Sequence, residues 1–161
     1  CKLDVSLYEE VEADVSATFQ AALVVILSSL AAGVGALSLG ASNFLMAPIL
    51  SLVSWYIWAY LIYLIGAKIF PETTTKSNHG ELLRTIGFSS APGLIRVFGF
   101  TPEIMSITFI GAGIWMLIAM VIAVRQALDY QSTWRAIGVV VIGFLVQAIV
   151  LIILLRIFGP A

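Results

Sequence analysis

A long apolar stretch without any charge constrains the fold of this chain more than any other feature. Residues 21–39 contain no Asp, Glu, Lys or Arg. A helix needs about 20 consecutive apolar residues to cross the hydrocarbon core of a bilayer. Inside that core, the backbone polar groups have to bond to one another within the helix. The stretch therefore predicts a membrane-spanning helix.

The composition of the whole chain also indicates that membrane lipid surrounds it. Hydrophobic residues make up 61% of it and charged residues 11%, whereas soluble domains carry about 25% charged residues. A water-soluble fold of this size could not hide so much apolar surface. We therefore predict an all-α polytopic bundle in contact with membrane lipid, formed by a single transmembrane domain over residues 1–161. The net charge of −1 excludes the basic surface that binding to nucleic acid requires.

Five segments are candidate spans. Four of them, residues 20–39, 44–69, 104–124 and 136–157, are long and apolar enough to cross the membrane. The fifth, residues 82–100, is ambiguous, because it is bounded by basic residues and broken by a Ser-Ser-Ala-Pro-Gly sequence in its middle. It could be a kinked span, a re-entrant element or a helix in the interface. We predict five spans, with four plus a re-entrant or interfacial helix as the alternative.

The positions of Lys and Arg predict the orientation, because cytoplasmic loops carry an excess of them. Both the five-span and the four-span topology place the amino terminus in the cytoplasm by the same margin, so the rule does not choose between them. We expect residues 1–19, which are acidic, to be cytoplasmic and the protein to lie in the cell (inner) membrane. With five spans, one side holds Lys2, Lys68, Lys76, Arg84, Arg125 and Arg135, and the other holds Arg96 and Arg156.

Residues that could carry chemistry are sparse. His79 is the only histidine and lies in a polar loop, where we expect it to be solvated. Cys1 is the only cysteine, so an internal disulfide or a cysteine metal cluster is excluded; whether it is a lipidated terminus stays open. The chain has no Gly-x-Ser-x-Gly motif and no His/Cys/carboxylate cluster with metal spacing. We therefore expect no enzyme activity, no metal and no cofactor.

Small residues repeat at intervals of four in two of the predicted spans. Such stripes let another helix backbone come close, either within the chain or from a partner chain. The mid-span residue Gln147 would be costly to leave unpaired, and we favour a hydrogen bond to another helix over a substrate contact. The stripes consist of Ser28, Ala32, Ala36 and Gly40 in the first span and of Ala119, Ala123 and Ala127 in the fourth.

Two further features allow a structural and a functional interpretation. The second span concentrates aromatic residues, and Tyr56, Tyr60 and Tyr63 share a face that also neighbours Trp55. Interfacial anchoring and packing are the favoured explanation, with a groove for a quinone, pigment or sterol as the alternative. In the broken segment, a kink at Ser89, Ser90 and Pro92 is favoured, although broken helices also form binding sites in transporters.

The segment Glu81-Leu-Leu-Arg-Thr-Ile-Gly-Phe-Ser-Ser-Ala-Pro92 resembles the region after the second span in Yip-type domains, from the family of Ypt/Rab-interacting membrane proteins. Residues 118–136 are also similar to the corresponding region of Yip-type domains. They leave one span through Arg125 and enter the last span through Ser132-Thr-Trp-Arg-Ala136. The resemblance implies five spans and a cytoplasmic amino terminus, and the family has no catalytic residues to transfer. The short form resembles a prokaryotic member.

We therefore predict a non-enzymatic scaffold or accessory subunit that packs against lipid and other membrane protein chains, in a hetero- or homo-oligomer. A small-solute permease or channel is the alternative, with its site at Ser89, Ser90, Pro92 and Gln147. A pigment- or quinone-associated subunit of an electron-transfer complex is a weaker alternative.

Overall fold

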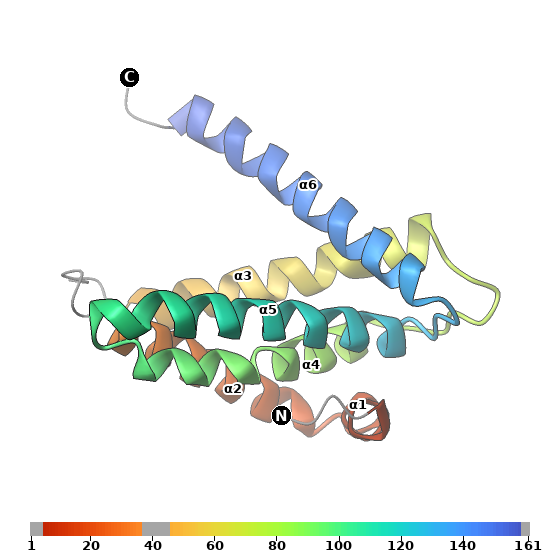
Figure 1. Cartoon of the computed structure of the whole chain (residues 1–161). Helices are drawn as coiled ribbons and strands as arrows, with labels where there is room; N and C mark the ends of the chain where they lie inside the picture. Colours follow the sequence, from red (N-terminus) through yellow and green to blue (C-terminus); the bar gives the residue numbers. More distant parts are fainter. Residues whose placement is uncertain (1–4, 37–45, 159–161) are drawn as a thin grey trace.

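Helices make up every regular element in the part of the chain that the structure describes, residues 5–36 and 46–158 (Figure 1). The structure is a computed structural model, and its helical content confirms the prediction of an all-α polytopic bundle. Gly40 and Cys1 lie outside the described residues. The elements are α1 (Val5–Ala13), α2 (Ala17–Gly35), α3 (Met46–Tyr63), η2 (Leu64–Ile69), α4 (His79–Ser89), η3 (Ala91–Phe98), α5 (Pro102–Ala127) and α6 (Thr133–Phe158).

Four helices are long and apolar enough to cross a membrane. They are Ala17–Gly35, Met46–Ile69, Glu103–Ala127 and Thr133–Val150. Each corresponds to one of the four unambiguous predicted spans, with shifts of a few residues at the ends. The ambiguous segment instead forms two short pieces, α4 and η3, joined at Ser90.

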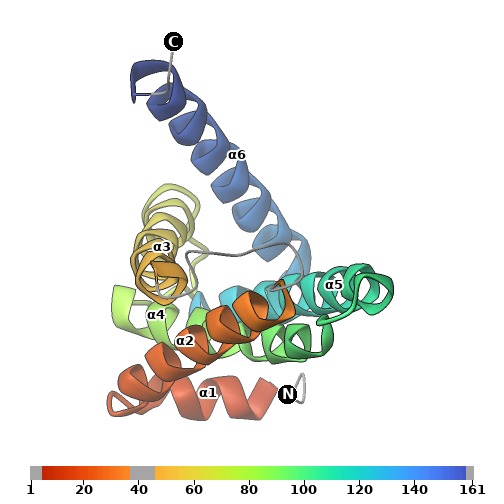
Figure 2. The same ribbon diagram turned by 90° about the vertical axis from the view of Figure 1, so that its left-hand side faces the viewer.

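The helices form a bundle from which one of them departs. In two views at right angles, α2 packs against α3, and α4 with η3 lies between α2 and α5 (Figures 1 and 2). The short helix α1 lies across one end of this bundle. Only the beginning of α6 packs on α3 and α5, and the helix then runs away from them at a wide angle.

The core lies where α3, α4, α5 and the start of α6 meet. Ile62 and Leu82 are fully buried there, as are Val124 and Leu128 of the region where α5 ends. The end of α3 widens into the π-helix η2, where the Phe70 N–H donates to the Ile65 carbonyl over 2.9 Å. This widening leaves carbonyl groups without helical partners.

The Tyr130 hydroxyl lies within hydrogen-bond distance of two of these carbonyls and shares its single hydrogen between them. Its hydroxyl is 2.9 Å from the Gly66 oxygen and 2.7 Å from the Phe70 oxygen. Leu128 packs against Gly66, where an added Cβ would overlap it. The connection between α5 and α6 is thereby fastened to the end of α3, which fixes where α6 starts.

A broken helix and the cleft beside it

The broken segment begins with a well-formed helix start. The Glu81 N–H donates to Asn78 Oδ1 over 3.1 Å, and the Asn78 N–H donates to Glu81 Oε2 over 2.8 Å. This reciprocal pair satisfies two backbone donors that a helix end would otherwise leave free. The helix consequently begins at His79, a few residues before the predicted position 82.

Arg84 does more than mark the edge of a span. Its side chain is 5% exposed, and its Nε donates to the Val11 carbonyl over 3.1 Å. A second nitrogen, Nη2, donates to the carbonyl of Glu12. These carbonyls belong to the last turn of α1, which has no helical donors for them, and a cation suits that end of a helix. Sequence reasoning missed this clamp, because nothing in the sequence places α1 next to Arg84.

The clamp lies among carboxylates. Glu12 is half-buried, and burial raises the pKa of its carboxyl to about 7, with the charges of Glu81 and Asp129 acting in the same direction and Arg84 opposing them. Glu9 is close as well, and it accepts a hydrogen bond of 3.4 Å from Gln126. Burial of Glu12 beside the clamp therefore favours its protonated form.

The break itself keeps its backbone paired. The Ser90 N–H donates to the Gly87 carbonyl over 3.1 Å, and the Gly93 N–H donates to the Ser90 carbonyl over 2.9 Å. These are the shorter loops of a 3₁₀-helix, which starts at Ala91 with Pro92 in its first turn. The Ser89 hydroxyl donates to the Ile86 carbonyl over 2.7 Å. Ser89 therefore supports the backbone and is not free for a ligand.

Small residues seat this segment on α2. An added Cβ at Gly87 would come within 2.7 Å of the Ala21 Cβ, one at Gly93 would overlap Ser28 Oγ, and one at Gly35 would overlap the Arg96 carbonyl. The contacts on α2 therefore recur every seven residues, and α4 with η3 runs along α2 in the same direction.

The face of α2 that is buried differs from the predicted stripe. Ser28 is buried, but Ala32 and Ala36 are only half-buried. Four residues cover slightly more than one helical turn of 3.6 residues, so a stripe with a spacing of four drifts around the helix. Residues spaced alternately by three and four stay on one side of the helix. In α5 the predicted residues Ala119, Ala123 and Ala127 are all fully buried. The buried face of α2 consists of Ala17, Ala21, Val25, Ser28, Ala31 and Gly35.

A cleft brings together three residues that the sequence singled out separately. Trp55 of α3, Ser90 and Gln147 of α6 line a shallow, open hollow of about 250 Å³. A second cavity of about 170 Å³ lies between α3 and α6 and shares Trp58 and Gln147 with the first. Pro92 is buried and lines neither cavity. The cleft thus contains two of the four residues predicted for a permease site.

The aromatic face of α3 holds a histidine. The His79 ring is in edge contact with Tyr56, Tyr60 and Tyr63, at centroid distances of 4.9, 5.5 and 6.3 Å. The expectation of a solvated loop histidine is therefore wrong, because His79 is half-buried as the first residue of α4. The tyrosines join α3 to the start of α4, which agrees with a packing role.

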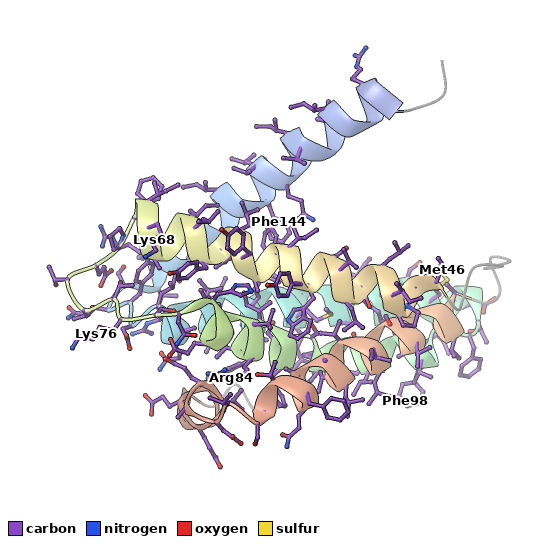
Figure 3. All side chains as sticks on the ribbon, turned by 180° about the vertical axis from the view of Figure 1, so that it is seen from behind. Met46, Lys68, Lys76, Arg84, Phe98 and Phe144 are labelled. Carbon is purple, nitrogen blue, oxygen red and sulfur yellow. The ribbon has the colours of Figure 1, made fainter. Side chains whose placement is uncertain are left out.

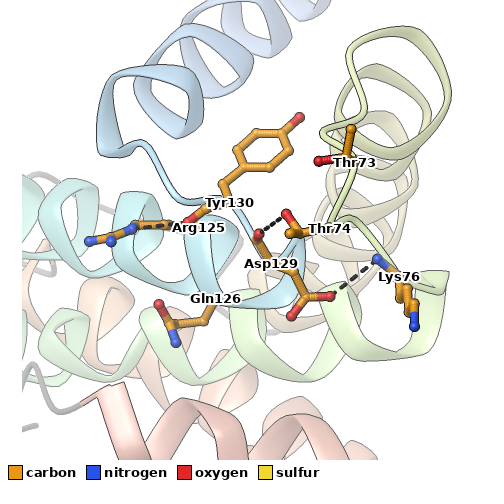
Figure 4. Close-up of a pocket in the computed structure, with 7 residues that line it drawn as sticks. All are labelled: Thr73, Thr74, Lys76, Arg125, Gln126, Asp129 and Tyr130. Carbon is orange, nitrogen blue, oxygen red and sulfur yellow. Dashed lines mark hydrogen bonds between the residues drawn. The ribbon is translucent and has the colours of Figure 1, made fainter.

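A polar pocket of about 630 Å³ lies at the loop end of the bundle (Figure 4). The Thr74 hydroxyl donates to the Asp129 carbonyl over 2.8 Å, and the Lys76 N–H donates to Asp129 Oδ2 over 3.1 Å. Asp129, two residues beyond the end of α5 at Ala127, is in the left-handed region at φ 52°. These bonds fasten the loop after η2 to the end of α5. The pocket is lined by Thr73, Thr74, Lys76, Arg125, Gln126, Asp129 and Tyr130.

Within residues 5–36 and 46–158, no group of three or more His, Cys, Asp or Glu side chains is placed to hold a metal ion. The comparison with known families finds one match. The model of the Yip1 domain matches residues 6–155, which is nearly the whole chain. No curated protein and no solved structure matches it.

Proposed function

The chain belongs to the Yip1 domain family, and from this premise we propose that it is a membrane scaffold or accessory subunit that binds other membrane helices through α6. It is a multi-pass membrane protein with several apolar helices. Proteins of this family are not known as enzymes.

The position of α6 carries the proposal. Ala136, Val139 and Val140, in its first turns, are buried against the bundle. Of the described side chains from Phe144 to Ile153, only Val146 is not exposed. The outer face of this part presents Leu145 and Ile149, each more than half exposed. A helix that stands away from its own bundle offers a long surface for van der Waals packing, which drives helix association in lipid.

We further propose that α4 and η3 cross the membrane together, which makes five spans. The support is an argument of parity. Thr74 and Lys76 bond to Asp129, so the loops before α4 and after α5 are at the same end of the bundle. Since α5 crosses once between them, the chain has to cross once more to return, and only α4 and η3 are available.

The length of the broken segment suits this role. The 11 residues of α4 and the 8 residues of η3 each advance about 16 Å at the usual helical rises. Together they match a hydrocarbon core of about 30 Å. The labelled residues agree, because Lys76 and Arg84 lie toward one end of the bundle and Phe98 lies at the other with Met46 (Figure 3).

Cysteine labelling with an impermeant maleimide tests this topology and its sidedness, in a Cys1→Ser background. We expect Thr75→Cys and Ser132→Cys to be labelled from the same side, and Thr101→Cys from the other. In intact cells, only Thr101→Cys should react, because basic loops stay in the cytoplasm. Labelling of Thr75→Cys and Ser132→Cys from opposite sides would exclude five spans.

The scaffold role is tested by purification in mild detergent and mass measurement of the native particle. We expect a complex, and Leu145→Trp with Ile149→Trp should dissociate it by blocking close approach on the outer face. The matched control is Ile107→Trp, on the exposed surface of α5, which should leave the complex intact. A wild-type protein that runs reproducibly alone as a monomer would contradict the proposal.

A second candidate is a permease for small solutes, favoured by the meeting of Ser90 and Gln147 in one cleft. Proteoliposome flux tests it. Gln147→Leu should lower the flux, whereas Gln126→Leu, at the loop end, should leave it unchanged. Flux equal to that of empty liposomes would dismiss this candidate.

A further inference from the structure

Gln147 is a polar side chain that lies exposed in the middle of an apolar spanning helix. Arg135 and Arg156 bound the uncharged part of α6, and Gln147 is near its centre. The side chain of Gln147 is exposed. Its carboxamide makes no hydrogen bond to any described residue, whereas that of Gln126, at the loop end, donates to Glu9. The bond to another helix of the chain that was predicted for Gln147 is therefore not found among residues 5–36 and 46–158.

The depth of this carboxamide restricts what can satisfy it. An amide has two donor hydrogens and an acceptor oxygen, and leaving them unpaired in an apolar medium is costly. The core of the bilayer contains no water. The ester carbonyls of phospholipids lie at the interface, about 15 Å from the midplane of a core of about 30 Å. Gln147 therefore requires a protein partner that brings a polar group to the same depth.

The side of α6 that carries Gln147 is buried at the start of the helix and free further on. Ala136, Val140 and Gly143 are buried against the bundle. Gln147 and Val150 continue the same spacing of three and four residues, which keeps them on the same side of the helix. Val150 is 49% exposed, because α6 has left the bundle by this point (Figure 2). The second half of this packing seam thus has no cover among the described residues.

A second copy of the chain supplies the required group at the required depth. The charge rule gives all copies the same orientation, so their α6 helices run in the same direction and their Gln147 side chains lie at the same level. Around a two-fold axis along the membrane normal, equivalent residues of two copies meet. Two carboxamides related in this way satisfy each other with reciprocal N–H···O bonds. In parallel coiled coils, one Asn in the seam fixes the register and the number of helices by the same means.

We infer that α6 pairs in parallel with α6 of a second copy, and that a pair of Gln147 carboxamides sets the register. Val150 supplies apolar contact in this seam, and the sequence continues the spacing at Leu154. Leu145 and Ile149 are each two residues from Gln147, about 200° around the helix, so the outer face stays free for other membrane proteins. The inference rests on the proposed function, in which α6 is the binding element, and it names one partner.

Disulfide cross-linking in liposomes tests the pairing, since Cys1→Ser removes the only cysteine. Val150→Cys leaves Gln147 in place and should give a product of twice the chain's mass on oxidation with copper phenanthroline, because a disulfide requires two Cβ atoms about 4 Å apart. Ile149→Cys, at nearly the same depth on the opposite side, is the matched control and should not cross-link. Adding Gln147→Leu to Val150→Cys should raise the protein-to-lipid ratio for half-maximal cross-linking about tenfold. Adding Gln126→Leu should change nothing.

Three results would overturn the inference. Cross-linking of Ile149→Cys in place of Val150→Cys would put the second copy on the outer face. Cross-linking of Val150→Cys that Gln147→Leu leaves unchanged would remove the amide pair from the contact. The third result is a complex in mild detergent whose Val150→Cys form does not cross-link in liposomes.

The last result would leave the proposed function standing, because another protein would then be the partner of α6. A protein that is monomeric in detergent and does not cross-link would reject both. The outer-face changes Leu145→Trp and Ile149→Trp should leave the Val150→Cys cross-link intact, and its loss in that variant would show that the two faces are not independent and overturn the seam.

Discussion

The contact between Gly93 and Ser28 makes the packing of the broken helix testable by a single methyl group. An added Cβ at Gly93 would overlap Ser28 Oγ and would also lie 3.1 Å from Met116 Sδ and 3.2 Å from Ser28 Cβ. Gly93→Ala therefore forces η3 away from α2, or forces Ser28 to change its rotamer. Overpacking of this kind costs about 1–3 kcal/mol, which lowers the ratio of folded to unfolded protein by a factor of about 5 to 150.

The overlap can be relieved from the other side. Ser28→Ala removes the overlapping oxygen, and the next two nearest atoms lie beyond 3 Å, which small adjustments can accommodate. Because none of the hydrogen bonds among the described residues uses Ser28 Oγ, Ser28→Ala alone should cost little. The double variant should recover most of the loss, and the coupling between the two positions should be about 1–2 kcal/mol in a double-mutant cycle.

Thermal and denaturant unfolding in detergent, followed by circular dichroism, measures these differences. Gly113→Ala is the matched control, since an added Cβ there meets nothing within 4 Å. It should be neutral or stabilising by up to about 1 kcal/mol, because Ala is the better helix former. If Gly93→Ala behaves like Gly113→Ala, or if Ser28→Ala does not rescue it, the parallel packing of η3 on α2 is refuted.

Three more predictions concern the loop end of the bundle. Arg84→Ala should detach α1, seen as faster hydrogen exchange of residues 5–13, with Arg84→Lys rescuing it only in part because an ammonium group lacks the guanidinium fork. Since burial raises the pKa of Glu12 to about 7, docking of α1 should be strongest below about pH 4.5 and should weaken as the pH rises through 7. Hydrogen exchange of residues 5–13, corrected for the effect of pH on exchange itself, should show this pH dependence. Glu12→Gln should abolish the pH dependence. Tyr130→Phe removes the hydroxyl that donates to the Gly66 and Phe70 carbonyls and should lower the melting temperature, whereas the same change at the exposed Tyr60 should not.

The long spans could be predicted from the sequence because their signal is length and the absence of charge, and neither depends on neighbours. The conformation of residues 82–100 could not be predicted in this way, because it depends on contacts with other helices. Its glycines look like helix breakers in the sequence, yet Gly87 and Gly93 are where another backbone comes closest. The capping pair of Asn78 and Glu81 was readable in principle, as an Asn followed three residues later by Glu.

The candidate cleft was only partly predictable, for a related reason. Ser90 and Gln147 stood out as polar residues in apolar segments, but nothing in a single sequence pairs residues from different spans. Trp58 is one of several aromatic residues in the second span, and only its surroundings reveal an indole N–H that lacks an acceptor among the described residues. The clamp at Arg84 was hidden in the same way, since its acceptors are backbone carbonyls of α1.

The glycines of the spans divide into two groups, and the division explains why a broken helix lies at the centre of the bundle. At Gly35, Gly87 and Gly93 an added Cβ would collide with a neighbouring element, whereas at Gly111 and Gly113 it would meet nothing. In lipid the hydrophobic effect does not hold helices together, so close approach of backbones has to supply the attraction. A 3₁₀ piece has a thinner cross-section and keeps its own hydrogen bonds, which lets it lie between α2 and α5 without exposing polar backbone. The break at Pro92 is then a means of packing.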